Sequence, residues 1–213
     1  MNKILPLFLL AILTTETNAQ TTDFQLWNDT QLIISLRKNL SATIWIFGRF
    51  GEDAQTTTDA RIGGLINKKI NKYLTLSGGY LYRYANPTFR RPLYESRYLG
   101  IATLTLPLTT DNKWTLINRN MYQYEARYSR PNATVIRNRF WLKRKLDKLE
   151  PFVAFESFYD IRLRGFARYR TQAGCSYSFN PKLSADFYYV RQDETGNRPG
   201  TLNGVGTSLR VYF

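Results

Sequence analysis

Three glutamates, Glu95, Glu125 and Glu156, are the residues of this chain whose type and surroundings come closest to chemistry. Each lies in the polar phase of an alternating segment, and two carboxylates held close together can act as a general acid and a general base. Each segment that carries one also carries arginine or lies beside a segment that does. Because a buried charge without a partner is costly, we interpret these glutamates as partners of arginine rather than as catalytic groups.

The chain contains no histidine. Its absence removes the usual base of serine and cysteine nucleophiles and the commonest protein ligand of zinc and haem. The acidic residues match no calcium-loop spacing either. We therefore predict a protein that is not an enzyme and that has no cofactor and no metal site.

The same polar phase carries more cations than carboxylates. The candidate charges of a barrel lumen are Glu95, Arg97, Arg119, Glu125, Arg127, Arg137, Arg139, Glu156, Arg168 and Arg170. Two interpretations stay open. Either paired charges fill a narrow lumen and the protein is a structural or loop-presenting barrel, or unpaired cations line a small passive pore for small solutes and favour anions.

The elements that position these charges are segments in which apolar and polar side chains alternate. In "VIRNRFWLKRKL", Ile136 and Phe140 fall on one side and Arg137 and Arg139 on the other. A helix would scatter the two arginines around its circumference, whereas a strand lines them up. Similar segments recur at residues 24–36, 40–50, 57–67, 73–85, 94–106, 113–127, 134–146, 151–160, 165–178, 182–192 and 203–213, and they predict an all-β protein.

The connections between these segments are alternately tight turns and looser polar loops. That alternation is typical of a transmembrane barrel, so we predict an antiparallel up-and-down transmembrane β-barrel of about 10–12 strands. The pattern itself gives eleven segments, whereas single-chain bacterial barrels have even counts. We expect one segment to be incomplete, divided or to hide a turn, and we favour twelve strands slightly over ten.

A soluble periplasmic β-barrel that binds a small apolar ligand is the alternative, because its strands alternate as well. Alternation does not say which face lies inside. The length of the segments and the tyrosine, tryptophan and phenylalanine residues at their ends favour the membrane barrel.

The first residues of the chain have the features of a secretory signal peptide. Lys3 precedes an apolar run over residues 4–13, and the small-residue pattern Thr17-Asn18-Ala19 follows. We expect residues 1–19 to be removed and residues 20–213 to form a single domain. The lone cysteine, Cys175, cannot form an intramolecular disulfide.

The net charge of +14 comes from cations scattered singly along the chain, which disfavours nucleic acid as a partner. Outer-membrane lipids are the expected partner instead. The chain ends on Tyr212 and Phe213, and aromatic rings are stable at a membrane interface. This ending resembles the last strand of bacterial outer-membrane barrels, whose final aromatic residue is read by the barrel-assembly machinery. We therefore expect Tyr212 and Phe213 to serve as interface anchor and assembly signal in the cell outer membrane.

The chain also resembles a family of uncharacterised outer-membrane proteins of Gram-negative bacteria, grouped as a domain of unknown function. The resemblance rests on Trp27 in the first segment and on the runs "LSGGYLYRY", "ESRYLGIATLTL", "NRNMYQYEARY" and "EPFVAFESFYD". It covers nearly all of the chain after the signal peptide. It implies a barrel and its location, and no established activity.

Overall fold

The computed structural model describes residues 23–51, 54–86, 92–128, 130–195 and 200–213. The expected signal peptide lies outside these residues. The described residues form eleven β-strands: β1 (Asp23–Arg37), β2 (Leu40–Gly51), β3 (Thr56–Lys69), β4 (Leu74–Ala85), β5 (Leu93–Pro107), β6 (Trp114–Arg127), β7 (Ala133–Arg144), β8 (Leu149–Asp160), β9 (Gly165–Asn180), β10 (Leu183–Glu194) and β11 (Gly200–Tyr212). No helix in this part of the chain is long and apolar enough to cross a membrane.

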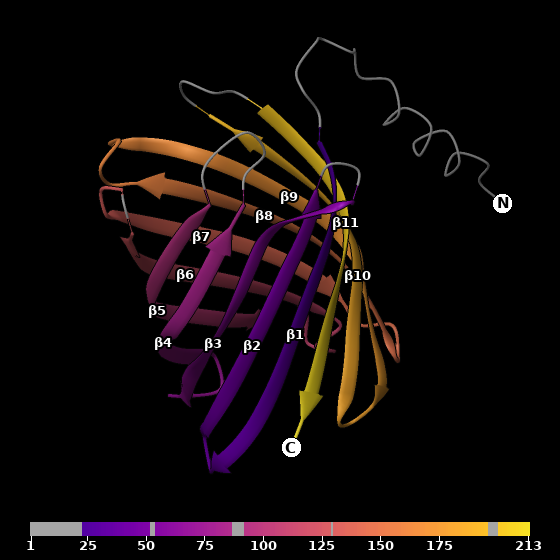
Figure 1. Ribbon diagram of the computed structural model, residues 1–213. Helices are drawn as coiled ribbons and strands as arrows, with labels where there is room; N and C mark the ends of the chain where they lie inside the picture. The colour runs from indigo at the N-terminus through magenta and orange to yellow at the C-terminus, as the bar shows by residue number, and fades with distance from the viewer. Residues whose placement is uncertain (1–22, 52–53, 87–91, 129, 196–199) are drawn as a thin grey trace, which may run out of the picture.

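The strands close into one barrel in which consecutive strands pair antiparallel (Figure 1). The last contact is different, because β1 pairs with β11 in parallel, from Asp23 opposite Leu202 to Ile33 opposite Tyr212. An odd number of alternating strands makes the first and last run in the same direction. The prediction that one segment had been miscounted is therefore wrong: the eleven segments read from the sequence are eleven strands, and the parallel seam accommodates the odd number.

The barrel has two distinct ends. At the turn end, strands are joined at residues 38–39, 70–73, 108–113, 145–148 and 181–182, and Phe213 also lies there. The loop end carries the other connections and the starts of both β1 and β11. Figure 1 shows the loop end at the top and the C-terminus at the bottom.

The tight turns have a local chemical basis. Asn39, Asn112 and Asp147 adopt left-handed backbone conformations, with φ of 64°, 54° and 58°. Asn and Asp tolerate this region better than other residues that carry a side chain. In the turn between β5 and β6, the Thr109 hydroxyl and the Lys113 amide donate to the Asp111 carboxylate, which lowers the pKa of Asp111 to about 2.

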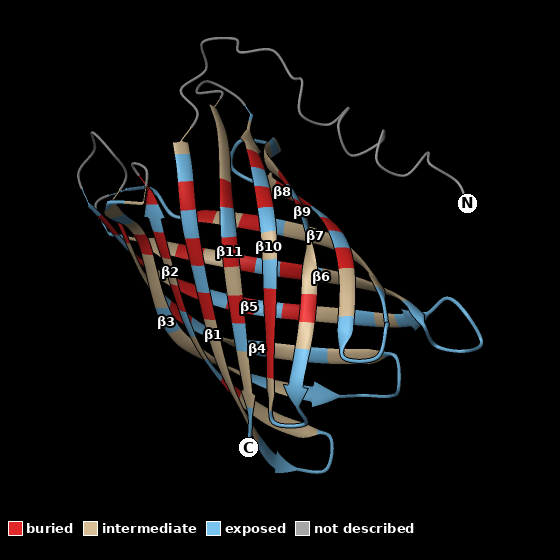
Figure 2. Cartoon of the chain, turned by 90° about the vertical axis from the view of Figure 1, so that its right-hand side faces the viewer, coloured by how far each residue is buried: buried red, intermediate tan, exposed pale blue. Residues whose placement is uncertain are grey.

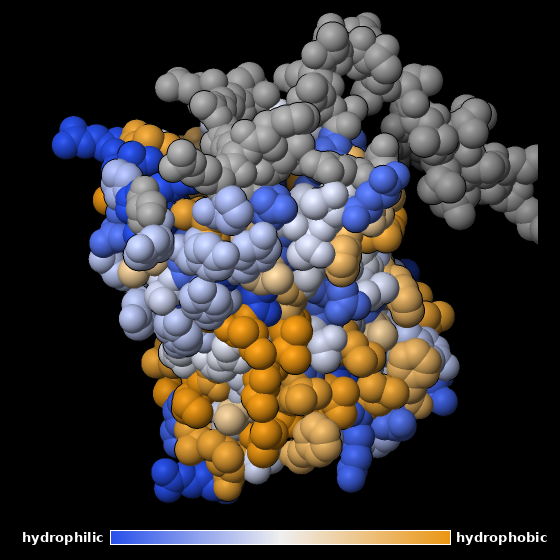
Figure 3. All heavy atoms as spheres, in the orientation of Figure 1, coloured by the Kyte–Doolittle hydropathy of each residue, from blue (hydrophilic) through white to orange (hydrophobic). Residues whose placement is uncertain are grey.

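Alternation along each strand separates an inner and an outer face. Burial changes from residue to residue along the strands, as the bands in Figure 2 show. Outward side chains are mainly aliphatic or aromatic, and Ile62, Val153 and Phe187 are each more than half exposed. In Figure 3 this apolar surface is concentrated on the lower half of the visible face, toward the turn end. Such a surface gains stability from hydrocarbon, as the outer face of a membrane-spanning barrel does.

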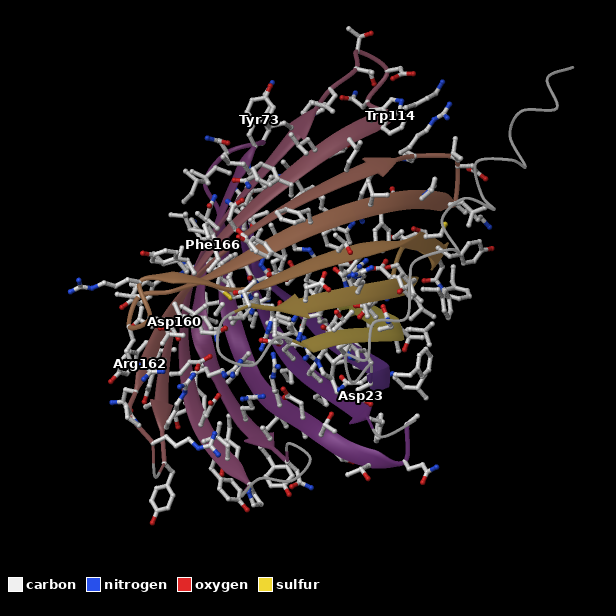
Figure 4. All side chains as sticks on the ribbon, turned by 90° about the horizontal axis from the view of Figure 1, so that it is seen from above. Asp23, Tyr73, Trp114, Asp160, Arg162 and Phe166 are labelled. Carbon is white, nitrogen blue, oxygen red and sulfur yellow. The ribbon has the colours of Figure 1, made fainter. Side chains whose placement is uncertain are left out.

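The inner face is polar and charged but carries two apolar clusters as well. Leu81, Leu99, Ile101 and Met121 form one on the wall of β4–β6, and Trp27, Phe47 and Val190 form the other. Seen from above, nitrogen and oxygen atoms of side chains crowd the space enclosed by the strands, whereas Tyr73 and Trp114 lie at the edge of the molecule (Figure 4). The interior is thus narrowed by side chains from all sides.

Glycine is required where strands approach closely. A Cβ at Gly63 would lie 2.0 Å from the carbonyl oxygen of Tyr80, and one at Gly206 would lie 2.4 Å from the ring of Tyr188. Gly63, like Gly206, is therefore a tightly packed barrel position.

Candidate functional site

A first charge network lies on the inner face of β3–β6. Glu95, 1% exposed, accepts hydrogen bonds from Arg83 at 3.1 Å and from Arg97 at 2.6 Å. Its other oxygen lies 3.2 Å from Arg127 Nε. Arg83, Glu95 and Arg127 are direct cross-strand partners, so opposite charges meet on one face of the sheet. Glu125 completes the network by pairing with Arg97 and Arg127.

A second network lies on β7–β10 and centres on Glu156. One carboxylate oxygen of Glu156 accepts hydrogen bonds from Arg137 Nε and Nη2, and the other accepts one from Arg170 Nη1 at 3.0 Å. Arg170 also donates to Gln192. Nearer the loop end, Arg168 pairs with Glu194 at 2.6 Å, with both side chains about one third exposed.

These contacts decide the role of the glutamates. Glu95, Glu125 and Glu156 are each paired with two or more arginines. Hydrogen bonds engage both oxygens of Glu125 and Glu156 but only one oxygen of Glu95. A carboxylate engaged in this way is poorly suited to transfer protons. The described residues also bring together no group of three or more His, Cys, Asp or Glu side chains suited to a metal ion.

Three inward arginines differ from the others, because Arg49, Arg119 and Arg139 make no ion pair within the described part of the chain. Arg49 is 7% exposed, and its guanidinium lies 3.6 Å from the centroid of the Trp27 ring. Arg139 lies over Trp141 and donates to Gln172.

Three cavities follow one another inside the barrel. An upper cavity of about 520 Å³ lies toward the loop end, a central cavity of about 170 Å³ follows, and a lower cavity of about 500 Å³ lies toward the turn end. Arg49 lines both the upper and the central cavity, and Arg119 and Arg139 line both the central and the lower cavity. The lumen therefore holds the least free space in its middle, and this central cavity is called the constriction below.

The constriction is strongly cationic. Seven arginines and two aspartates line the central cavity: Arg49, Arg61, Arg119, Arg137, Arg139, Arg170 and Arg210, with Asp29 and Asp186. Asp186 is paired with Arg210, whereas Asp29 makes no ion pair among the described residues and accepts hydrogen bonds from the uncharged Trp45 and Gln31 side chains. Cations aimed at a narrow, low-dielectric passage attract anions and repel cations.

All ten charges in the candidate set lie on inward-facing positions of the strands, but they do not form one site. Glu95, Arg97, Glu125 and Arg127 belong to the first network, and Arg137, Glu156 and Arg170 belong to the second. Arg168 lies near the loop end, while Arg119 and Arg139 lie at the constriction.

Arg49, Asp29 and Asp186 also line the constriction, and none of them is in the candidate set. Asp29 shares its alternation phase with Gln25 and Gln31, and that pattern was available in the sequence. The segment predicted over residues 134–146 is shorter in the structure, because β7 ends at Arg144 and leaves Lys145 beyond the strand.

The two aromatic residues at the C-terminus lie in different surroundings. Tyr212 faces inward and lines the lower cavity, next to Ile33. Phe213 is 68% exposed, and its backbone is held against β1 by hydrogen bonds to Ile33 and Ser35. Of the two rings, that of Phe213 is the more exposed, whereas that of Tyr212 lines the lower cavity.

Comparison with known proteins identifies the family. Residues 24–202 match the family described as "Protein of unknown function (DUF2490)". The chain belongs to this family. No curated protein matches it.

Among solved structures, "Anion-selective porin from Comamonas acidovorans" is similar, with a TM-score of 0.43 and 9% sequence identity. The match covers 83% of this chain and 53% of that one, so this family member spans about half the length of the porin. At that TM-score the porin's selectivity has no bearing on this chain, whose properties follow from its own residues.

Proposed function

We propose that this protein is a narrow, anion-selective passive pore of the bacterial outer membrane, without enzymatic activity. The observation that carries the proposal is the central constriction, which is lined by seven arginines and two aspartates. Four of these arginines are paired with carboxylates, and Arg49, Arg119 and Arg139 make no ion pair among the described residues. Rings of arginine or lysine favour anions in membrane pores. The wider cavities on either side give small solutes access to this passage from both ends.

The outer face supports a location in the membrane. Its exposed side chains are mainly aliphatic or aromatic, and charged side chains are gathered on the inner face. A soluble carrier of an apolar ligand needs the opposite arrangement, with an apolar interior and a polar exterior. The expected signal peptide and the exposed Phe213 agree with an outer-membrane location.

A filled, structural barrel is the second candidate function. It is favoured by the paired networks around Glu95 and Glu156 and by the apolar cluster around Met121, all of which take up space in the lumen. Barrels of about eight strands are filled by side chains, whereas about sixteen strands leave an open channel. Eleven strands fall between these cases, and conductance distinguishes the two functions.

The test is the reversal potential in a planar bilayer across a potassium chloride gradient. The wild-type protein is expected to prefer chloride. Arg119→Glu places a negative charge at the constriction and is expected to shift the reversal potential toward potassium. Arg144→Glu is the matched control, because Arg144 ends β7 outside the lumen, with its guanidinium 5.4 Å from the Trp114 ring centroid.

Before these measurements, the formation of a closed β-barrel in the membrane is checked by the change in gel mobility on boiling. A heat-modifiable protein that inserts into the bilayer without conductance would refute the pore and leave the filled barrel. An equal shift in Arg119→Glu and Arg144→Glu would mean that the constriction does not set selectivity.

A further inference from the structure

Two arginines without carboxylate partners face each other across one strand pair. Arg119 on β6 and Arg139 on β7 are direct cross-strand partners on the inner face. Like charges directly opposite each other destabilise a sheet unless something neutralises them. Both arginines line the central and the lower cavity, so they lie where these cavities meet.

The nearest candidate for neutralising them is already occupied. Glu156 is the cross-strand partner of Arg139 on β8. Its two oxygens, however, accept hydrogen bonds from Arg137 and Arg170. Neither Arg119 nor Arg139 forms an ion pair with a described residue. Their positive charge is offset only at longer range, by Glu156, Asp29 and Asp186.

Unused hydrogen-bond donors surround the same pair. Arg139 Nε and Trp141 Nε1 are buried and have no hydrogen-bond partner among the described residues. Trp141 lies two residues beyond Arg139 on the same strand face and lines the same two cavities. Buried donors without acceptors destabilise a protein, so an acceptor from outside the chain would stabilise them.

We propose that Arg119, Arg139 and Trp141 form a binding site for a small doubly charged oxyanion of the phosphate or sulfate class. Guanidinium groups present parallel donors that match the oxygens of such an anion. Two negative charges neutralise the two arginines. The central cavity of about 170 Å³ excludes large anions from the passage. The role of this site in transport rests on the proposed pore, whereas binding itself does not.

Binding is measured by titrating inorganic phosphate into the purified, detergent-solubilised barrel in a calorimeter. Saturable binding is expected for the wild type, and Arg119→Gln and Arg139→Gln should each weaken it about tenfold or more, since each loses a charge-assisted partner. Arg144→Gln, on the same strand as Arg139 but outside the lumen, should bind as the wild type does. Trp141→Phe keeps a ring and loses only the N–H, so a smaller loss is expected.

Every variant is first tested for the heat-dependent gel shift, which reports a folded barrel. If an arginine variant does not fold, the phosphate affinity of Trp141→Phe still tests the proposed site. Phosphate should also reduce the chloride current at concentrations that match its calorimetric affinity. Anion-selective current without phosphate binding would overturn the proposed oxyanion site and would still support the proposed pore. Phosphate binding without any current would refute the pore and leave the site. Equal weakening in Arg144→Gln and Arg119→Gln would overturn the site as well.

Discussion

Removing the charge of Glu156 tests whether the inner networks stabilise the barrel. Glu156 is 4% exposed and holds Arg137 and Arg170 through its two oxygens. Glu156→Gln keeps the shape of the side chain but leaves two buried guanidinium groups without a negative partner. Removing one partner of a buried ion pair costs about 3–5 kcal/mol, because the remaining charge stays desolvated.

The matched control is Glu194→Gln, near the loop end. Glu194 pairs with Arg168 at 2.6 Å, but both side chains are about one third exposed, and water replaces much of the lost interaction. Exposed ion pairs contribute about 0–1 kcal/mol. The two variants remove the same chemical group, so the difference between them isolates the effect of burial.

The assay is urea or thermal unfolding in detergent, followed by loss of the heat-dependent gel shift. For a chain of this length, 1 kcal/mol corresponds to about 2–4 °C, so Glu156→Gln should lower the midpoint by roughly 10 °C. Glu194→Gln should lower it by less than about 4 °C. Equal unfolding midpoints for the two variants would refute the argument that burial makes the Glu156 network stabilising.

Glu156→Gln also adds one net positive charge to the constriction, so the current through this variant should be more anion-selective than the wild-type current.

Two further predictions follow from the seam and from the packing of glycine. If the turn end faces the periplasm, the parallel seam places the start of β1 on the outside of the cell. In a background without the native cysteine, a membrane-impermeant thiol reagent added to intact cells should then label Asp23→Cys and should not label Asp111→Cys. Labelling of both would contradict the topology. Gly206→Ala should destabilise the barrel by about 1–3 kcal/mol, because the new Cβ would overlap the ring of Tyr188. Gly100→Ala is the control, since nothing lies within 4 Å of a Cβ there, and a similar loss in both would rule out the steric explanation.

The number of strands follows correctly from the alternation in the sequence, whereas the general rule of even strand numbers predicts it wrongly. The eleven alternating segments agree with the eleven strands to within three residues at every boundary. The expectation of an even number came from known barrels and not from this chain. Local alternation reports the strands correctly, but it holds no information on how the first and last strands pair, because that contact joins residues about 179 positions apart, such as Asn28 and Thr207.

The strands, the two faces of each strand and the set of charges that shares one face can all be predicted from the amino-acid sequence, because a period of two is a local property of the backbone. It did not determine that the charged face lies inside, since a soluble barrel alternates as well. Only the closed structure decides which arginines find carboxylates: Arg137 reaches Glu156, while Arg119 lies opposite Arg139. Strand register sets these neighbours, and register depends on the whole barrel. The cationic constriction and the site proposed within it are therefore consequences of tertiary structure.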